Sequence, residues 1–166
     1  MALTYSFGSA TQFDKLFATQ LQADLNELTA EGTWTPAITF ATPGDLTVVY
    51  SAQAGKYTKI GKLVIVQFQT NTSTFTHTTA SGALQITGLP FVSENVASGT
   101  DRGLGVVSGI TKAGYTQFIF NVTANVSLMT MTACGSGVGA SAVTAADMPT
   151  GGSVIFSTTF AYRAAT

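Results

Sequence analysis

Hydrophobic and polar residues alternate along much of the chain beyond its first thirty residues, a pattern typical of β-strands that bury one face. In the clearest case, residues 33–40, the large side chains of Trp34, Ile38 and Phe40 fall on one side. Pro36 has no amide hydrogen to give to a neighbouring strand. We therefore expect this strand to lie at the edge of a sheet or to start near Pro36.

Glycine and proline divide the rest of the chain into further short strands. Two are predicted at residues 48–50 and 57–60, with a tight reversal at residues 53–55, which include a glycine. In residues 62–70 both faces are largely apolar, which predicts a central strand of a packed sheet. Further strands are predicted at residues 83–87, 104–111, 115–123, 126–133 and 153–162. Residues 135–149, rich in glycine and alanine, are interpreted as a long surface loop.

The segment before these strands has the periodicity of an amphipathic helix, predicted over residues 11–30. Its apolar residues recur at spacings of three and four: Phe13, Leu16, Phe17, Leu21, Leu25 and Leu28. We expect Thr11 to cap the helix and Gly32 to end it. Two interpretations of the apolar stripe stay open, packing against the chain's own sandwich or a three-fold bundle with sister chains. Two heptads are too few for an independent coiled coil, so a bundle would need support from contacts between sandwiches.

The overall prediction is a mainly β fold, an antiparallel β-sandwich of jelly-roll type, preceded by an N-terminal arm and a short amphipathic helix. We divide the chain into residues 1–31, for attachment and trimerisation, and residues 32–166, the sandwich. Residues 1–10, where Leu3, Tyr5 and Phe7 alternate with smaller side chains, are expected to form an extended arm that docks on another surface.

Composition and charge narrow the classes of partner. Charged residues make up 9% of the 166 residues, against about 25% in an average protein. Much of the surface must then be rich in hydroxyl groups or buried against other copies, and the second option favours an oligomer. A net charge of -1 gives no electrostatic attraction for nucleic acid or an anionic membrane, and no apolar run is long enough to predict a membrane span.

Candidates for catalytic chemistry are few. His77 is the single histidine and lies in a threonine-rich segment, where an exposed or hydrogen-bonded structural role is expected. Cys134 is the single cysteine, so it forms no intramolecular disulfide, and it is interpreted as a small buried apolar residue. Asp101 and Arg102 are interpreted as a surface turn pair. We therefore predict no enzymatic activity, no cofactor and no metal site.

Three motifs carry a resemblance to a known family. They are Trp34-Thr35-Pro36, the run from Gln53 to Val64 with Gly-Lys-Tyr-Thr-Lys-Ile-Gly at its centre, and Ile-Thr-Gly-Leu-Pro-Phe at residues 86–91. Together they resemble a module of tailed-bacteriophage virion proteins, found in head-decoration and tail-fibre proteins. The resemblance implies a trimeric β-sandwich on the surface of a particle that is assembled in the cytoplasm of a bacterial host.

Within that family, the sequence favours a homotrimeric capsid decoration or cement protein, also described as a head-fibre protein, that stabilises the particle. The chain starts at Met1 with only a short arm and one helix before the sandwich, whereas a host-recognising fibre would need a long shaft. The expected partners are sister chains and the major capsid protein or another virion protein. Candidate capsid or trimer contacts are Leu3, Tyr5, Phe7, Phe13, Leu16, Phe17, Leu21, Leu25 and Leu28.

Two other functions compete with decoration. One is a tail-fibre tip that binds a host receptor or surface glycan, for which Phe75, Tyr115 and Tyr162 would be candidate contacts if they were exposed in loops. The other is a small cellular carbohydrate-binding module, which would leave the amphipathic N-terminal segment unexplained.

Overall fold

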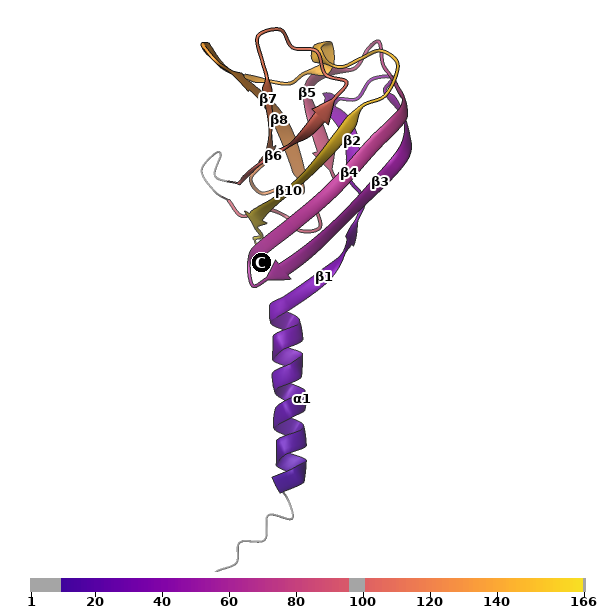
Figure 1. The fold of residues 1–166 in the computed structure, drawn as a ribbon. Coiled ribbons are helices and arrows are strands. Elements are labelled where there is room, and N and C mark those ends of the chain that lie inside the picture. The colour runs from indigo at the N-terminus through magenta and orange to yellow at the C-terminus, as the bar shows by residue number, and fades with distance from the viewer. Residues whose placement is uncertain (1–9, 96–100, 166) are drawn as a thin grey trace, which may run out of the picture.

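The computed structural model describes residues 10–95 and 101–165, and within the helix the side chains of residues 16–26. Within these residues one α-helix, α1 (Ala10–Leu28), leads into a body built of strands (Figure 1). The strands are β1 (Thr29–Trp34), β2 (Ala37–Thr42), β3 (Thr47–Ile60), β4 (Leu63–Thr76), β5 (Ser81–Thr87), β6 (Arg102–Ser108), β7 (Gln117–Val122), β8 (Leu128–Gly135), β9 (Val138–Ala142) and β10 (Ile155–Arg163). A short 3-10 helix, η1 (Ala145–Asp147), lies between β9 and β10.

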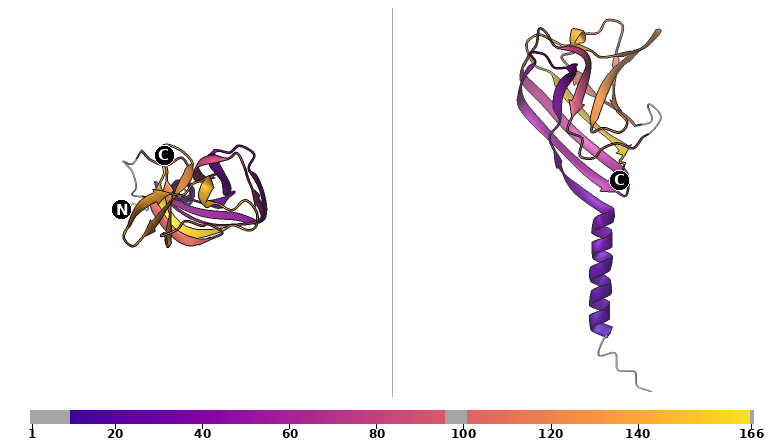
Figure 2. Two further views of the ribbon diagram at one scale, coloured as in Figure 1. Left: turned by 90° about the horizontal axis from the view of Figure 1, so that it is seen from above. Right: turned by 180° about the vertical axis from the view of Figure 1, so that it is seen from behind.

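All ten strands belong to one antiparallel sheet, in the order β1-β3-β4-β10-β6-β7-β8-β5-β2, with β9 paired to β8. The sheet curls so that its two halves face each other across the core, as the view from above shows (Figure 2). Strands β1, β3, β4 and β10 form one half, strands β2, β5, β7 and β8 the other, and β6 joins them by pairing with both β10 and β7. The predicted fold class, a mainly β antiparallel sandwich after a short helix, is confirmed.

Aromatic rings fill the space between the two halves. The ring of Trp34 meets Phe68 edge to face at a centroid distance of 5.4 Å, and Phe68 meets Phe120 at 5.5 Å. Phe120 in turn meets Phe156 at 6.0 Å. Edge-to-face pairs of this kind add to the free energy of burying the rings. The row of rings therefore ties β1, β4, β7 and β10 into one core.

The predicted strand over residues 33–40 is two strands that lie at opposite edges of the sheet. β1 pairs with β3 up to the position where Trp34 faces Gly55, and β2 pairs with β5 from Ala37 onward. Between them the backbone passes from one half of the sandwich to the other at Thr35 and Pro36. The prediction that a strand edge or start lies at Pro36 is thus confirmed, and Trp34, Ile38 and Phe40 are all buried as expected.

Two side chains of β3 hold this corner. The hydroxyl of Tyr50 accepts a hydrogen bond from the amide of Ile38 at 2.6 Å. The side-chain amide of Gln53 donates to the carbonyl of Pro36 at 2.8 Å. The amide of Ile38 and the carbonyl of Pro36 lie beyond the β1–β3 ladder, and side chains of β3 supply their hydrogen-bond partners.

The tight reversal predicted at residues 53–55 is wrong, because β3 runs unbroken past this point and pairs with β4 along its length, with register shifts near Tyr50. Gly55 instead allows Trp34 to pack closely against β3. A Cβ at Gly55 would lie 2.5 Å from Nε1 of Trp34, so the indole can cross the strand only where no side chain exists. The reversal lies between β3 and β4, at Gly61, whose φ is 57°.

The predicted helix boundaries also need correction. α1 begins at Ala10, so Thr11 lies in its first turn rather than before it, and α1 ends at Leu28. Gly32 is a residue of β1, where it faces Tyr57 of β3. A Cβ at Gly32 would lie 2.8 Å from the Tyr57 ring, which accounts for a glycine inside a strand.

The long surface loop predicted at residues 135–149 is wrong as well. This segment contains β9 and η1, and Val143, Ala145 and Met148 are buried. These three residues contribute to the core, whereas most of β9 is exposed.

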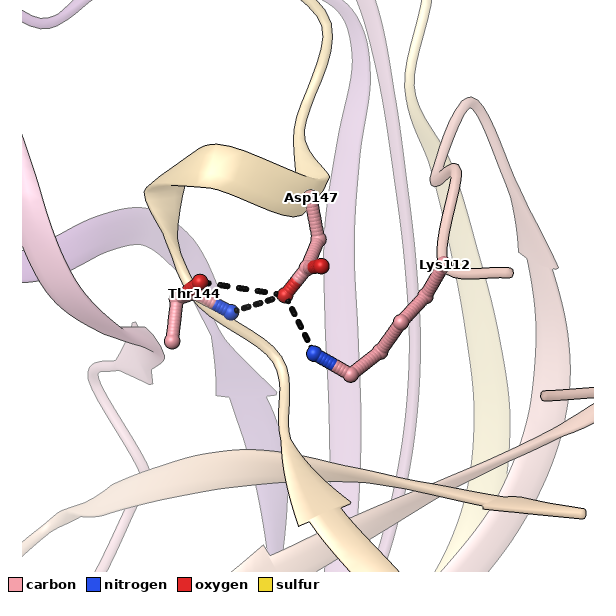
Figure 3. Close-up of polar contacts among 3 residues, drawn as sticks. All are labelled: Lys112, Thr144 and Asp147. Carbon is pink, nitrogen blue, oxygen red and sulfur yellow. Dashed lines mark hydrogen bonds and ion pairs between the residues drawn. The ribbon is translucent and has the colours of Figure 1, made fainter. Parts of the chain in front are cut away.

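One carboxylate fixes the end of this segment (Figure 3). Oδ2 of Asp147 accepts hydrogen bonds from Nζ of Lys112 at 2.8 Å, from the amide of Thr144 at 2.8 Å and from its hydroxyl at 3.1 Å. Burial acts to raise the pKa of Asp147, but the hydrogen bonds from Lys112 and Thr144 outweigh it, so the pKa lies below its ordinary value. Asp147 thus links η1 to the connection between β6 and β7.

Replacing Gly55 tests the contact with Trp34. We expect Gly55→Ala to lower the free energy of unfolding by about 1–3 kcal/mol, because the indole must move off the strand. Urea unfolding measures the change. Gly139→Ala is the matched control, since a Cβ there would have no neighbour within 4 Å in the described part of the chain. Equal effects of the two substitutions would contradict this account.

Replacing Asp147 tests the anchor of η1. The lowered pKa means that the ionised carboxylate stabilises the fold above its ordinary pKa of 3.8, and that this contribution is lost as the pH falls below that value. We expect Asp147→Asn to lose about 1–3 kcal/mol at pH 7 and to show a shallower loss of stability in acid. Urea unfolding between pH 2 and pH 7 measures both.

Glu94→Gln is the control for Asp147→Asn. It removes an exposed ion pair, in which Glu94 lies 3.0 Å from Nε of Arg163. Exposed pairs contribute less than about 1 kcal/mol, so this variant should unfold almost as the natural chain does. If Glu94→Gln lost as much stability as Asp147→Asn, the partial burial of the Asp147 carboxylate would not explain the effect of replacing it.

Candidate assembly surface

Helix α1 stands away from the sandwich as a stalk, and both side views show only its C-terminal end near the strands (Figures 1 and 2). Side-chain hydrogen bonds one turn apart, from Gln20 to Asp24 and from Gln22 to Asn26, support it along its polar side. At its end the hydroxyl of Thr29 donates to the carbonyl of Leu25 at 2.9 Å, which satisfies one of the carbonyls left free in the last turn.

The apolar stripe of this helix is open to solvent. Leu16 and Phe17 are 68% and 64% exposed, and Leu21 and Leu25 are 49% and 47% exposed. The interpretation in which the stripe packs against the chain's own sandwich is therefore wrong. Phe17, Leu21 and Leu25 follow one another at intervals of four residues, so they lie along one side of the stalk.

The structure places only part of the predicted contact set. Leu3, Tyr5 and Phe7 lie outside the described residues. Phe13 and Leu28 lie in α1, but their side chains are not among those described. The role of all nine residues in assembly stays a prediction.

A second exposed apolar surface, missed by the sequence analysis, lies on the sandwich. We call it the outer sheet face, formed by the sides of β3, β4 and β6 that point away from the core. Its members are Ile60 (50% exposed), Leu63 (41%), Ile65 (39%), Leu104 (65%) and Val106 (66%). These residues form two apolar groups, one on β3 and β4 and one on β6, and the outward side chains Ser157, Thr159 and Ala161 of β10 lie between them. Large apolar side chains gathered on one face are a feature of contact surfaces.

The pairing of the strands places these residues on one surface. Ile60 pairs with Leu63 across the β3–β4 turn. Val106 pairs with Ser157 of β10, which pairs with Gln69 of β4, an exposed residue on the same side of β4 as Ile65. β4 is central, as predicted, but only one of its faces is covered: Val64 and Val66 are buried, whereas Leu63 and Ile65 are exposed.

Two shallow hollows adjoin on this face. One, of about 390 Å³, is lined by Glu31, Lys56, Ile65 and Gln67 among others. The next, of about 240 Å³, shares Lys56, Gln67 and Thr159 with it. Glu31 and Lys56 form no ion pair within the described residues, although they line the same hollow. The residues that line the two hollows include no histidine and no cysteine; their polar members include Glu31, Lys56 and Ser157.

The candidates for catalytic chemistry lie apart from these surfaces. His77 is buried between the rings of Phe40 and Phe75, and its Nε2 has no hydrogen-bond partner among the described residues, so the expectation of an exposed or hydrogen-bonded histidine is wrong. Cys134 is half-buried in β8. Asp101 accepts a hydrogen bond from the amide of Arg163 at 3.2 Å, which ties it to the end of β10.

Two other kinds of feature are absent from the described residues. The described residues contain no group of three or more His, Cys, Asp or Glu side chains that could hold a metal ion. Within the same residues, no helix has the length and apolar character needed to cross a membrane. Two of the predicted tip contacts, Phe75 and Tyr162, are buried in the core, which removes them as candidates for binding a receptor.

Comparison with known proteins gives a fold but no family. No protein-family model and no curated protein sequence matches the chain. The crystal structure of the Dettilon tailspike protein (gp208) is similar, with a TM-score of 0.57 and 18% sequence identity over 81% of this chain. The chain spans about a quarter of the length of that tailspike, since the match covers 24% of it. At this level of identity, the similarity shows a shared fold.

Charging the stripe of α1 tests whether it is a contact surface. We expect Leu21→Lys combined with Leu25→Lys to dissociate assemblies of the purified chain, because each leucine buried in a contact contributes about 1.5–3 kcal/mol. Sedimentation velocity measures the change in mass. Gln22→Lys combined with Asn26→Lys adds the same charge on the polar side of the helix and should leave the mass unchanged. The account is contradicted if both pairs act alike.

Proposed function

We propose that this chain is a structural protein of a bacteriophage particle, displayed on the particle surface as a homotrimer and attached through its N-terminal segment. The observation that carries the proposal is the projecting helix α1, whose apolar side chains Phe17, Leu21 and Leu25 face solvent. An isolated amphipathic helix of this length is marginal in water. It requires a partner, and three copies packed along their stripes would bury it.

The tailspike-like fold of the sandwich supports a place on the virion. It agrees with the resemblance of residues 32–91 to modules of phage head and tail proteins. Low charge fits the same role, since a chain with so few charged residues has much surface that can be buried in an assembly. The protein would act by binding and bridging, without catalysis, a cofactor or a metal.

The first candidate location is the capsid, where the protein would serve as a decoration or cement protein. In this role the N-terminal segments of one trimer bind the major capsid protein at three points. Three weak contacts held together give a high effective concentration, so the trimer binds tightly without any single strong site. Bridging between capsid subunits would then stabilise the particle.

The second candidate location is the tail, and the similarity to a tailspike favours it. A tail-fibre or tailspike module of this kind would present the sandwich to a receptor or glycan on the host surface. Of the predicted tip contacts, Tyr115 is the half-exposed one. The N-terminal segment would in this case join the module to the rest of the tail.

Co-sedimentation distinguishes the two locations. The purified chain is mixed with capsids that lack it and, separately, with tails that lack it. We expect binding to capsids, and we expect removal of residues 1–28 to abolish it. The cut is placed at Leu28 because Thr29 and Ala30 pair with Ile60 and Lys59 and belong to the sheet.

Urea unfolding of the shortened chain controls for a damaged sandwich. Binding to tails alone would transfer the proposal to its second candidate. Capsid binding that persists without residues 1–28, or binding to neither particle, would contradict attachment through the N-terminal segment.

A further inference from the structure

The outer sheet face has the features of a contact surface rather than of a solvated one. On β4, Ile65 lies between the buried residues Val64 and Val66, and it is still 39% exposed because it points away from the core. On β6, Leu104 and Val106 are about two-thirds exposed, although they flank Gly105, whose Cβ position would lie 2.7 Å from Thr158 on the core side. β4 thus presents apolar side chains on both faces, and β6 presents them on its outer face opposite glycine; the described chain covers only the core side of each strand.

This face is continuous with the stalk. Thr29, the residue after α1, pairs with Ile60, and Ile60 pairs with Leu63. The end of the helix therefore lies beside the apolar end of the β3–β4 hairpin, as Figure 1 shows where α1 meets the sheet. A partner that covers the C-terminal end of α1 would therefore lie close to Ile60 and Leu63, at one end of the outer sheet face.

The charges on the face fit a copy of the same chain. Glu31 and Lys56 line one hollow and form no ion pair within the described residues. Arg163, at the end of β10, is already engaged with Glu94 at 3.0 Å. The face thus carries side chains of both signs, Glu31, Lys56 and Arg102, the last on the same side of β6 as Leu104. A second copy brings the same groups, so Glu31 of one copy can pair with Lys56 or Arg102 of the other.

We infer that the outer sheet face packs against a second copy of this chain, within the same assembly that α1 holds together. The inference rests on the proposed function, because it takes the homotrimer as given and names the sandwich surface that completes it. It also supplies the contacts between sandwiches that a helix of this length needs for support.

Thiol labelling of the purified full-length chain tests this surface. Cysteine is introduced by Ile65→Cys or Val106→Cys on the face, and by Val138→Cys on β9 as a control, each in a Cys134→Ala background. Ile65 and Val138 are matched, since they are 39% and 42% exposed in the single chain. A maleimide should react with both alike unless a partner covers one of them. Unfolding in urea verifies that each variant is folded.

We expect several-fold slower labelling at the two face positions than at the control, and equal rates once Leu21→Lys and Leu25→Lys separate the copies. Equal rates in chains that sediment as trimers would overturn the inference and leave the proposed trimer intact. A monomeric mass would overturn both. Slow labelling that persists in monomers would also overturn it, because the chain itself would then cover the thiol. Protection seen only on assembled particles would assign the face to another virion protein instead.

Discussion

The sandwich depends on the covalent link that Thr35 and Pro36 make between the two edge strands of its single sheet. A curled sheet buries its core only if its halves stay closed, and the aromatic row from Trp34 to Phe156 requires both halves. Because β1 and β2 are consecutive in the chain and lie at opposite ends of the sheet order, one short segment closes it. Trp34 can lie across β3 at this corner because Gly55 leaves room for the indole.

Sequence periodicity predicted much of this fold, and its errors have physical causes. The alternation of Trp34, Ile38 and Phe40 identified the core side correctly, but periodicity alone does not say that a strand changes sheet partners at a proline. Gly55 was interpreted as part of a turn at residues 53–55. It is instead a strand residue whose missing side chain leaves space for the Trp34 ring of a neighbouring strand. Residues 135–149 resembled a loop because small residues carry little pattern, although Val143, Ala145 and Met148 are buried and Asp147 bonds to Lys112.

Of the two exposed apolar surfaces, the sequence predicted the stripe of α1 but not the outer sheet face. Helical spacing identified the stripe of α1, and the structure adds that the sandwich does not cover it. The outer sheet face was missed because apolar residues on both sides of β4 were interpreted as burial on both sides within one chain. A strand with two apolar faces indicates that each face is covered, but the apolar pattern is the same whether the second face is covered by the same chain or by another one. In a chain with 9% charged residues, a second copy is the simpler source of that layer.

In the arrangement that we propose, the helix and the outer sheet face of three chains meet around a shared axis and the sandwiches project from the particle. Sedimentation equilibrium of the purified full-length chain over a wide range of concentration tests it most directly. The account predicts a single species of three times the chain mass of 17.1 kDa. A mass of one chain at every concentration would contradict it.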